Sequence, residues 1–159
     1  MRKATYENNY WTTQDFDNCA AMGMSVIRLP FTYMNLCDDN GNLKSNAWRR
    51  LDWFVSNCSS RGMYVLDMHG AFGSQNGMDH SGEVNDGKQL YYNQGNKNKT
   101  LNLWAKIAEH FKGNPAVAAY DILNEPGIKA AATYSLHWDF YNEIYKTIRS
   151  KDSNHIIIM

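Results

Sequence analysis

The chain has 159 residues, which is long enough for one domain with a sizeable hydrophobic core. Sixteen Lys and Arg balance sixteen Asp and Glu, so the formal net charge is zero, which argues against electrostatic binding of nucleic acid or of an anionic membrane surface. Aromatic residues make up 13% of the chain, a content typical either of a large core or of a surface that stacks on sugar rings.

The first predicted elements are a helix and a strand. Thr12 and Asp15 have the spacing of a capping box, Phe16 begins an apolar helix face, and Gly23 is the predicted stop. A strand is predicted over residues 25–30. Its closing proline should end it, because proline has no N–H group for the hydrogen-bond ladder.

The middle of the chain repeats this order after a loop predicted over residues 31–44. An apolar face predicts a helix over residues 46–61, with Gly62 at its end. A strand follows over residues 63–69. Residues 70–98 are rich in Gly and Asn and show no period, which predicts a long binding loop.

Two further helix and strand predictions complete the chain. A helix is predicted over residues 100–111 and a buried strand over residues 118–125, which Pro126 should end. The last helix is predicted over residues 134–150 and the last strand over residues 156–159. Because the chain stops within this apolar strand, we expect it to be part of a longer domain.

The alternation of helices with short apolar strands predicts a parallel sheet covered by helices. Right-handed crossovers leave two main architectures, an open doubly wound sheet or a (β/α)8 barrel. Four predicted strands are too few to close a barrel, which typically needs about 250 residues.

Cysteine spacing and hydropathy bear on disulfides, metal binding and the cellular location of the protein. Cys19, Cys37 and Cys58 lack the spacing of a disulfide framework or of a zinc site. No apolar run approaches the length of a membrane span, and no export signal is visible in the polar stretch after Met1. We expect either a cytoplasmic protein or a chain that begins after its export signal.

Three strand-end motifs resemble those of a known family. They are VIRLP (residues 26–30), LDMHGA (66–71) with GSQNG (73–77), and LNEP (123–126). In this order they resemble glycoside hydrolase family 5, the cellulase and β-glucanase family of retaining (β/α)8-barrel enzymes. The resemblance extends from about Tyr10 to Met159. It implies an α/β fold, a partial TIM barrel of roughly four βα units, in a single incomplete catalytic domain over residues 1–159.

The candidate site residues follow the predicted strands. Arg28, His69 and Glu125 are each expected at the carboxyl end of a strand, and in a barrel these ends meet on one rim. Cleavage of a glycosidic bond needs a carboxylic acid beside the leaving oxygen, and desolvation or neighbouring negative charge can keep Glu125 protonated. We therefore interpret Glu125 as the general acid/base and the Asn124 amide as a hydrogen-bonding partner for a sugar hydroxyl.

The neighbouring side chains have structural alternatives. The resemblance implies that Arg28 steers the nucleophile, but its guanidinium can equally pair with Asp67 or Asp121. His69 can orient the sugar or a carboxylate, or it can be a satisfied core histidine. His80, in a glycine-bounded loop, is a loop residue with no assigned role.

The aromatic residues divide into two groups. Trp11, Phe72 and Tyr91 are candidates for stacking on sugar rings. Three tryptophans lie on predicted helix faces and are expected in the core: Trp48, Trp104 and Trp138.

One catalytic group is not found among these residues. A retaining glycosidase needs a second carboxylate about 5 Å from the acid, acting as nucleophile. The other glutamates do not follow buried strands: Glu7, Glu83, Glu109 and Glu143. The resemblance places the nucleophile after Met159, so we expect the chain alone to lack normal turnover. No metal or cofactor is implied, because an acid and a nucleophile suffice for this chemistry.

We therefore expect a retaining glycoside hydrolase, an endo- or exo-β-glucanase acting on β-glucan polysaccharides or oligosaccharides, with no nucleic-acid or membrane partner. The resemblance implies secretion. Two alternatives are a non-catalytic carbohydrate-binding protein on the same scaffold and an open doubly wound domain with a nucleotide or signalling role. Against the last, no predicted strand is followed by a G-x-G-x-x-G or G-x-x-x-x-G-K-[ST] loop.

Overall fold

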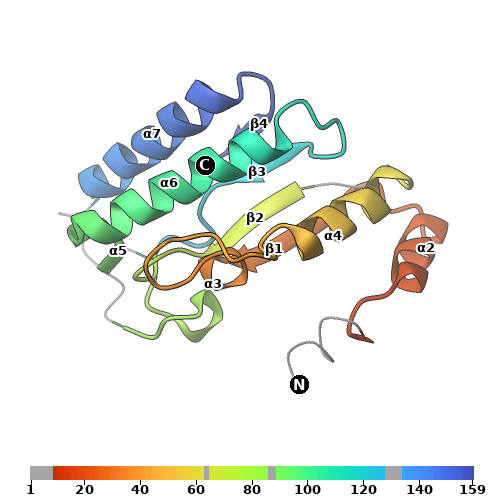
Figure 1. Cartoon of the computed structure of the whole chain (residues 1–159), viewed down its shortest axis with the longest axis horizontal. Coiled ribbons are helices and arrows are strands. Elements are labelled where there is room, and N and C mark those ends of the chain that lie inside the picture. Colours follow the sequence, from red (N-terminus) through yellow and green to blue (C-terminus); the bar gives the residue numbers. More distant parts are fainter. Residues whose placement is uncertain (1–8, 63–64, 86–88, 128–133) are drawn as a thin grey trace.

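The computed structural model describes residues 9–62, 65–85, 89–127 and 134–159. Their strands form one parallel sheet in chain order (Figure 1): β1 (Arg28–Thr32), β2 (Val65–Gly70), β3 (Ala119–Asp121) and β4 (Ile156–Ile158). The helices are α2 (Thr13–Ala21), α3 (Tyr33–Leu36), α4 (Arg49–Ser59), the 3-10 helix η1 (Asp79–Ser81), α5 (Gln89–Tyr92), α6 (Gln94–Phe111) and α7 (Tyr134–Lys151).

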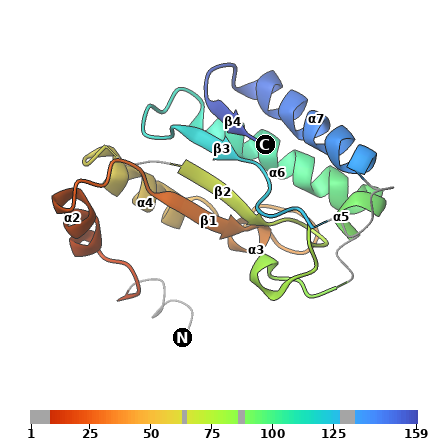
Figure 2. The same ribbon diagram turned by 180° about the vertical axis from the view of Figure 1, so that it is seen from behind.

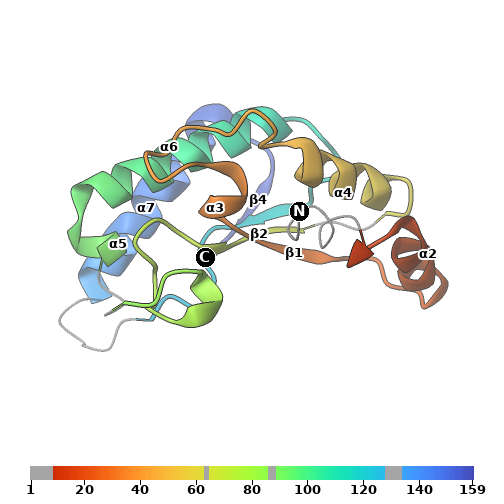
Figure 3. The same cartoon turned by 60° about the horizontal axis from the view of Figure 1, so that its bottom comes forward.

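The helices cover one face of the sheet. The strands lie in front of α4 and α6 when the molecule is seen from behind (Figure 2), and the view in Figure 3 places α3, α4 and α6 on the same side. Alternate strand residues such as Leu66, Met68 and Tyr120 are buried toward these helices. The opposite face is left uncovered by α3, α4 and α6. Its side chains include Arg28, which is half-exposed.

The core lies between the sheet and α4, α6 and α7. Trp104 on α6 is fully buried, and its Nε1–H donates to the carbonyl of Ile122 at 3.2 Å. Trp48 is partly buried and stacks on His110, with 4.2 Å between ring centroids. The core prediction is therefore confirmed for Trp104 and holds in part for Trp48.

Trp138 contradicts the same prediction, because it is 61% exposed on α7. The buried side of α7 is instead formed by Phe140, Tyr141, Ile144 and Ile148. Trp138 keeps helical spacing with Tyr141, but no described element covers it. A helical period thus identifies an apolar face without showing how much of that face a neighbour covers.

The start of α2 follows the predicted capping box. Asp15 Oδ2 accepts hydrogen bonds from the N–H of Thr12 at 2.7 Å and from its hydroxyl at 2.9 Å. Phe16 is buried on the predicted apolar face together with Cys19, whereas Ala20 is exposed.

Two strands have bounds that differ from the prediction. β1 begins at Arg28 and continues past Pro30 to Thr32. Because β1 lies at the edge of the described sheet, the missing proline N–H is tolerated there. β3 ends at Asp121, before Glu125, although the N–H of Asn124 still donates to the carbonyl of Met68 at 3.0 Å. Glu125 therefore lies in the connection that follows the strand.

The predicted loop over residues 70–98 is shorter than expected. It contains η1 and α5, and α6 begins at Gln94 rather than at residue 100. Asn93 caps α6, because its side chain accepts from the N–H of Asn96 at 3.1 Å. The first turns of α6 are polar and carry no hydrophobic period, which is why the sequence pattern missed them. In the part of the chain that is described, no helix has the length and apolar character needed to cross a membrane.

Candidate active site

Four polar side chains form a closed ring on the face of the sheet that the helices leave open. Asp67 Oδ2 accepts from His69 Nδ1 at 2.9 Å, and Asp67 Oδ1 lies 3.2 Å from Arg28 Nη2. The same Arg28 nitrogen donates to Asn124 Oδ1 at 2.8 Å. Asn124 Nδ2 lies 3.4 Å from His69 Nε2, which completes the ring. The structure thus brings Arg28, His69 and Asn124 together, as the sequence predicts.

The ring has one consistent pattern of donors and acceptors. Arg28 can only donate, so the oxygen of the Asn124 amide must face it. The Asp67 carboxylate accepts the Nδ1–H of His69, which leaves a lone pair on Nε2 for the NH2 group of Asn124. The orientation of the Asn124 amide is therefore fixed by its neighbours, and its other N–H remains available for a ligand.

Asp67 is the buried member of the ring. Its side chain is fully buried, and this burial raises the pKa of the carboxyl, while the hydrogen bond from His69 and the charge of Arg28 oppose the rise. A buried carboxylate is costly unless it is paired. Asp67 thus requires both partners, and both partners hold Asn124.

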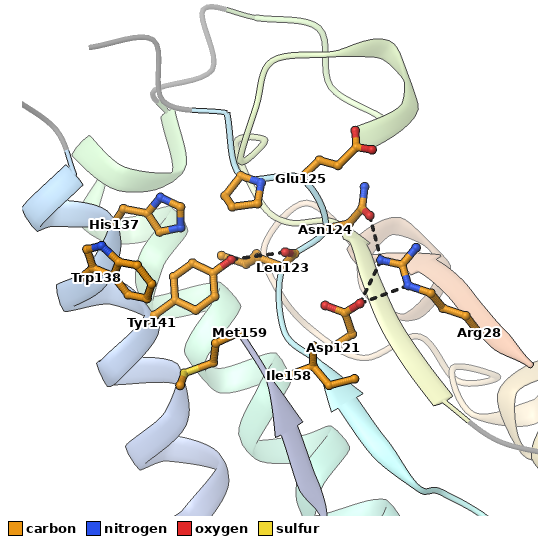
Figure 4. Close-up of a pocket in the computed structure, with 11 residues that line it drawn as sticks. Arg28, Asp121, Leu123, Asn124, Glu125, His137, Trp138, Tyr141, Ile158 and Met159 are labelled. Carbon is orange, nitrogen blue, oxygen red and sulfur yellow. Dashed lines mark hydrogen bonds and ion pairs between the residues drawn. The ribbon is translucent and has the colours of Figure 1, made fainter. Parts of the chain in front are cut away.

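Arg28 reaches the site in a different way from the one predicted. It is the first residue of β1, level with Val65, rather than the last. Its long side chain extends to Asp121 Oδ2, with Nε at 3.1 Å and Nη2 at 2.9 Å, and to Asn124 (Figure 4). Both structural partners considered for Arg28, Asp67 and Asp121, are therefore contacted at once. A side chain that already neutralises two carboxylates positions Asn124 without giving up its structural role.

Glu125 follows Asn124 with a left-handed backbone, φ 42°. Its side chain is 71% exposed, and Oε2 lies 3.3 Å from Nε2 of His80. In Figure 4 the carboxylate points away from Arg28. The desolvation expected for Glu125 is thus not supplied by the described residues, whereas its place beside the Arg28–His69–Asn124 cluster agrees with the prediction.

The buried side-chain amide of Gln75 connects the two backbone segments that carry His69 and Asn124. Gln75 Nε2 donates to the carbonyls of His69 and Asn124, each at 2.9 Å, and its Oε1 accepts from the N–H of Ala71 at 3.1 Å. The carbonyl of Gln75 also accepts from the N–H of Gly127 at 3.1 Å. Sequence reasoning quoted Gln75 within a motif but assigned it no role. The sequence feature that could have identified Gln75 is its place as a polar residue in a glycine-bounded loop directly after a strand.

An open pocket of about 610 Å³ lies between this site and the first half of α7 (Figure 4). Tyr141 forms part of its wall, with its hydroxyl donating to the carbonyl of Leu123 at 3.3 Å and its ring stacked on His137. Burial lowers the pKa of His137. The residues around the pocket are Arg28, Asp121, Leu123, Asn124, Glu125, Pro126, His137, Trp138, Tyr141, Ile158 and Met159. The exposed ring of Trp138, predicted to be core, is thus at the site.

Phe72 and Tyr91 are not available for stacking on a sugar. Phe72 is 2% exposed and stacks on Tyr33, with 3.9 Å between the ring centroids. Tyr91 is buried, and its hydroxyl donates to the carbonyl of Gln75 at 3.2 Å. Both rings support the loop from beneath, so the stacking role predicted for them is wrong.

Trp11 does not reach the site either. Its ring packs on Phe16 and Phe54, with centroid distances of 5.7 and 5.9 Å. These residues form a separate apolar cluster between α2 and α4 that includes no residue of the site. Trp11 therefore anchors α2 instead of lying beside Asn124 and Glu125.

The other described glutamates have partners elsewhere. Glu83 accepts from the N–H of Gly73 at 3.1 Å, and two more form ion pairs: Glu109 with Lys151 and Glu143 with Lys97. Glu7 lies outside the described residues. Within the described ranges, no group of three or more His, Cys, Asp or Glu side chains could hold a metal ion. Of the described glutamates, Glu125 is thus the one that lines the pocket at this site.

Comparison with known proteins identifies related chains. The family model described as Cellulase (glycosyl hydrolase family 5) matches residues 2–159. The chain is 31% identical over 153 residues to a β-xylosidase of Phanerodontia chrysosporium, an alignment that covers 94% of this chain and 32% of that protein. It is 30% identical over 165 residues to the probable glucan 1,3-β-glucosidase A of Aspergillus fumigatus, covering 96% of this chain and 38% of that protein.

A similar relation holds for solved structures. The crystal structure of the Pseudomonas stutzeri endoglucanase Cel5A superposes with a TM-score of 0.72 at 26% identity, covering 92% of this chain and 42% of that one. An endogalactoceramidase superposes with a TM-score of 0.75 at 23% identity, covering 92% and 43%. Of the two curated relatives named above, the chain spans roughly a third of the length, 32% and 38%.

Proposed function

The chain belongs to the cellulase family, glycosyl hydrolase family 5, and we propose that it provides the acid/base part of the active site of a retaining β-glucan hydrolase. The sheet and its helices are part of a (β/α)8 barrel. The observation that carries the proposal is the position of Glu125, directly after an Asn124 amide whose orientation is fixed by Arg28 and His69.

The chemistry needs two carboxyl groups about 5 Å apart. In the first step a carboxylate attacks the anomeric carbon, the bond to the leaving oxygen breaks, and that oxygen takes the proton of Glu125. In the second step the Glu125 carboxylate takes a proton from water, whose oxygen attacks the anomeric carbon and releases the nucleophile. We place the nucleophile in residues that follow Met159 in the complete protein.

Asn124 and Trp138 would bind the sugar beside Glu125. The N–H of Asn124 that the ring leaves free can donate to a sugar hydroxyl, and a fixed amide loses little entropy when it does so. Trp138 presents an exposed ring to the pocket and takes the stacking role predicted for Trp11 and Phe72. β-Glucan polysaccharides or oligosaccharides are the proposed substrates. A polymeric substrate of this kind also supports secretion of the protein and a role in polysaccharide degradation.

The first test is Glu125→Gln in the complete protein. General acid catalysis contributes about 10²- to 10⁴-fold, so kcat/KM on an unactivated β-glucan should fall by at least that range. Hydrolysis of an aryl β-glucoside with a good leaving group should lose less in its first step, because that bond breaks without protonation. Release of reducing sugar and of phenol measures the two reactions.

Glu109→Gln is the matched control, because Glu109 pairs with Lys151 away from the site. Its kinetics should equal those of the wild type. Near-normal glucan hydrolysis by Glu125→Gln would refute the assignment of Glu125. Glucan binding by the wild type without any product would instead fit a non-catalytic carbohydrate-binding protein.

A further inference from the structure

His80 lies beside the acid/base carboxyl, although sequence reasoning gave it no role. It belongs to η1, and its Nε2 is 3.3 Å from Oε2 of Glu125 and 3.0 Å from Nδ2 of Asn76. Its ring centroid is 5.5 Å from that of His69. On its own element, Asp79 Oδ1 lies 4.0 Å from Nδ1. These are the titratable and polar groups that the described residues place around the imidazole.

The amide of Asn76 can have only one orientation. Its Oδ1 accepts from the N–H of Met78 at 2.9 Å, and its Nδ2 donates to the carbonyl of Glu125 at 3.1 Å. Both partners are backbone groups whose polarity cannot change, so a flipped amide would lose both hydrogen bonds. The NH2 group of Asn76 therefore faces His80, and the Nε2 atom that it approaches must act as an acceptor.

This fixes where His80 carries its proton. With an acceptor at Nε2, the proton of the neutral ring is on Nδ1, on the side of the Asp79 carboxylate. Oε2 of Glu125 lies 3.3 Å from the same Nε2 atom, whose single lone pair is therefore shared between Asn76 and Glu125. An ionised Glu125 would place two acceptors against each other, whereas a protonated Glu125 can donate its O–H to Nε2.

We propose that His80, held in its Nδ1–H form by Asn76, is a positioning residue that keeps the catalytic proton on Glu125 before glycosidic cleavage. This inference rests on the proposed function. The contact with His80 stabilises the protonated form of Glu125, which burial cannot do because the Glu125 side chain is largely exposed. After the proton has passed to the leaving oxygen, the carboxylate again faces a lone pair. Taking a proton from water in the second step relieves that repulsion.

The 3.3 Å separation is compatible with this role. It is long for a hydrogen bond between a carboxyl and an imidazole. Catalytic hydrogen bonds often tighten only when substrate is bound. Glu125 is attached to the site by its backbone, through the Asn76 contact to its carbonyl. A small rotation of the exposed side chain therefore suffices to shorten the distance without moving the main chain.

The kinetic test compares His80→Leu with His80→Gln in the complete protein. Leucine offers no acceptor, whereas the glutamine side chain has a carbonyl oxygen. For His80→Leu we expect kcat on an unactivated β-oligoglucoside to fall about 10- to 100-fold, part of the contribution of general acid catalysis, with KM unchanged. The first-step burst on a dinitrophenyl β-glucoside should stay as in the wild type. The alkaline limb of the pH profile should move to lower pH, and His80→Gln should recover part of the loss.

His110→Leu is the matched control, because His110 stacks on Trp48 and binds Asp52 away from the site. Equal losses on both substrates, or an unchanged pH profile in His80→Leu, would overturn the proposal. Imidazole 15N NMR of the unsubstituted protein tests it without any variant. A protonated Nδ1 and an unprotonated Nε2 in His80 at neutral pH support the proposal, and the opposite tautomer refutes it.

The outcomes also separate the two proposals. If Glu125→Gln abolishes glucan hydrolysis while His80→Leu does not change it, only the role of His80 is refuted. If Glu125→Gln retains activity, the proposed function fails whatever His80 does.

Discussion

Asp67 sets the orientation of the Asn124 side-chain amide through Arg28 and His69, without contacting Asn124 itself. Its two oxygens face Arg28 Nη2 at 3.2 Å and His69 Nδ1 at 2.9 Å. Arg28 then presents only donors to Asn124, and His69 presents only a lone pair. The orientation of Asn124 is thus a consequence of a carboxylate buried beneath it.

Asp67→Asn tests this arrangement in the complete protein. The new amide oxygen can still accept from His69, but its NH2 group would face the Arg28 guanidinium, donor against donor. Misplacement of Asn124 should lower kcat/KM on β-glucan by about 100-fold, the size of effect that small displacements in active sites produce. Steady-state kinetics measure this loss, and Asp139→Asn, at an exposed position of α7, is the control. Unchanged kinetics in Asp67→Asn would show that the ring is only structural.

At the scale of elements, a second buried carboxylate, that of Asp152, connects a helix to two strands at the opposite end of the sheet. Asp152 follows α7, and its Oδ2 accepts from the hydroxyl of Tyr120 on β3 at 2.9 Å and from Nδ1 of His155, just before β4. Its Oδ1 accepts from the N–H of Asn154 at 2.9 Å. Nε2 of His155 contacts the carbonyl of Asn114 at 3.0 Å. This network ties α7 to the amino ends of two strands.

The network predicts acid sensitivity. Burial by itself would raise the pKa of Asp152, but hydrogen bonds from Asn154, His155 and Tyr120 outweigh it and lower the pKa from its usual 3.8 to about 2. A carboxyl whose pKa is lower in the folded state stabilises the fold above its unfolded pKa, and this stabilisation is lost as pH falls from about 4 to about 2.

Asp152→Asn should therefore reduce the free energy of unfolding at pH 6 by about 2 kcal/mol, and should remove this part of the loss between pH 4 and pH 2. Urea unfolding of the complete protein at several pH values measures both effects. Asp17→Asn is a suitable control, because Asp17 is exposed and pairs with Arg61 on the surface. An Asp152→Asn protein as stable as the wild type at pH 6 would contradict the prediction.

At the scale of the whole molecule, the described sheet has an uncovered face and a free edge. Ile156 and Ile158 of β4 are 63% and 42% exposed, although they belong to a strand that is apolar throughout. Ile157, between them, packs against the core under the helices. This pattern is that of a strand whose inner face lines a barrel, and it agrees with the similarity to barrel enzymes of about twice the length.

The carboxyl groups that the described residues place at the site predict that the 159-residue chain alone has no normal turnover. Of the described glutamates, Glu125 alone lines the pocket, and a retaining mechanism requires two carboxyl groups about 5 Å apart. Purified chain incubated with β-glucan should release no reducing sugar above background, while the complete protein should. Enzyme-like rates from the isolated chain would show that a second carboxylate is already present.

The sequence by itself determined the architecture and indicated a candidate site. Alternating apolar strands and amphipathic helices specify a parallel α/β sheet, since each pattern depends only on neighbours in the chain. The motifs around His69 and Asn124-Glu125 identified the candidate site, because the carboxyl ends of parallel strands share one edge, whereas Arg28 reaches it from the start of β1. Pairing of Arg28 with Asp67 or Asp121 was also foreseen from side-chain parity along the strands.

Only the tertiary structure decided which partners these residues have. It showed Arg28 reaching the site from the start of β1, Trp11 and Phe72 packed in apolar clusters, Trp138 exposed at the pocket, and His80 beside Glu125. A sequence period gives the apolar side of an element but not the element that covers it. Hydrogen-bond direction likewise depends on groups far apart in the chain, as with Asn76 and Glu125, which meet only after the sheet has formed.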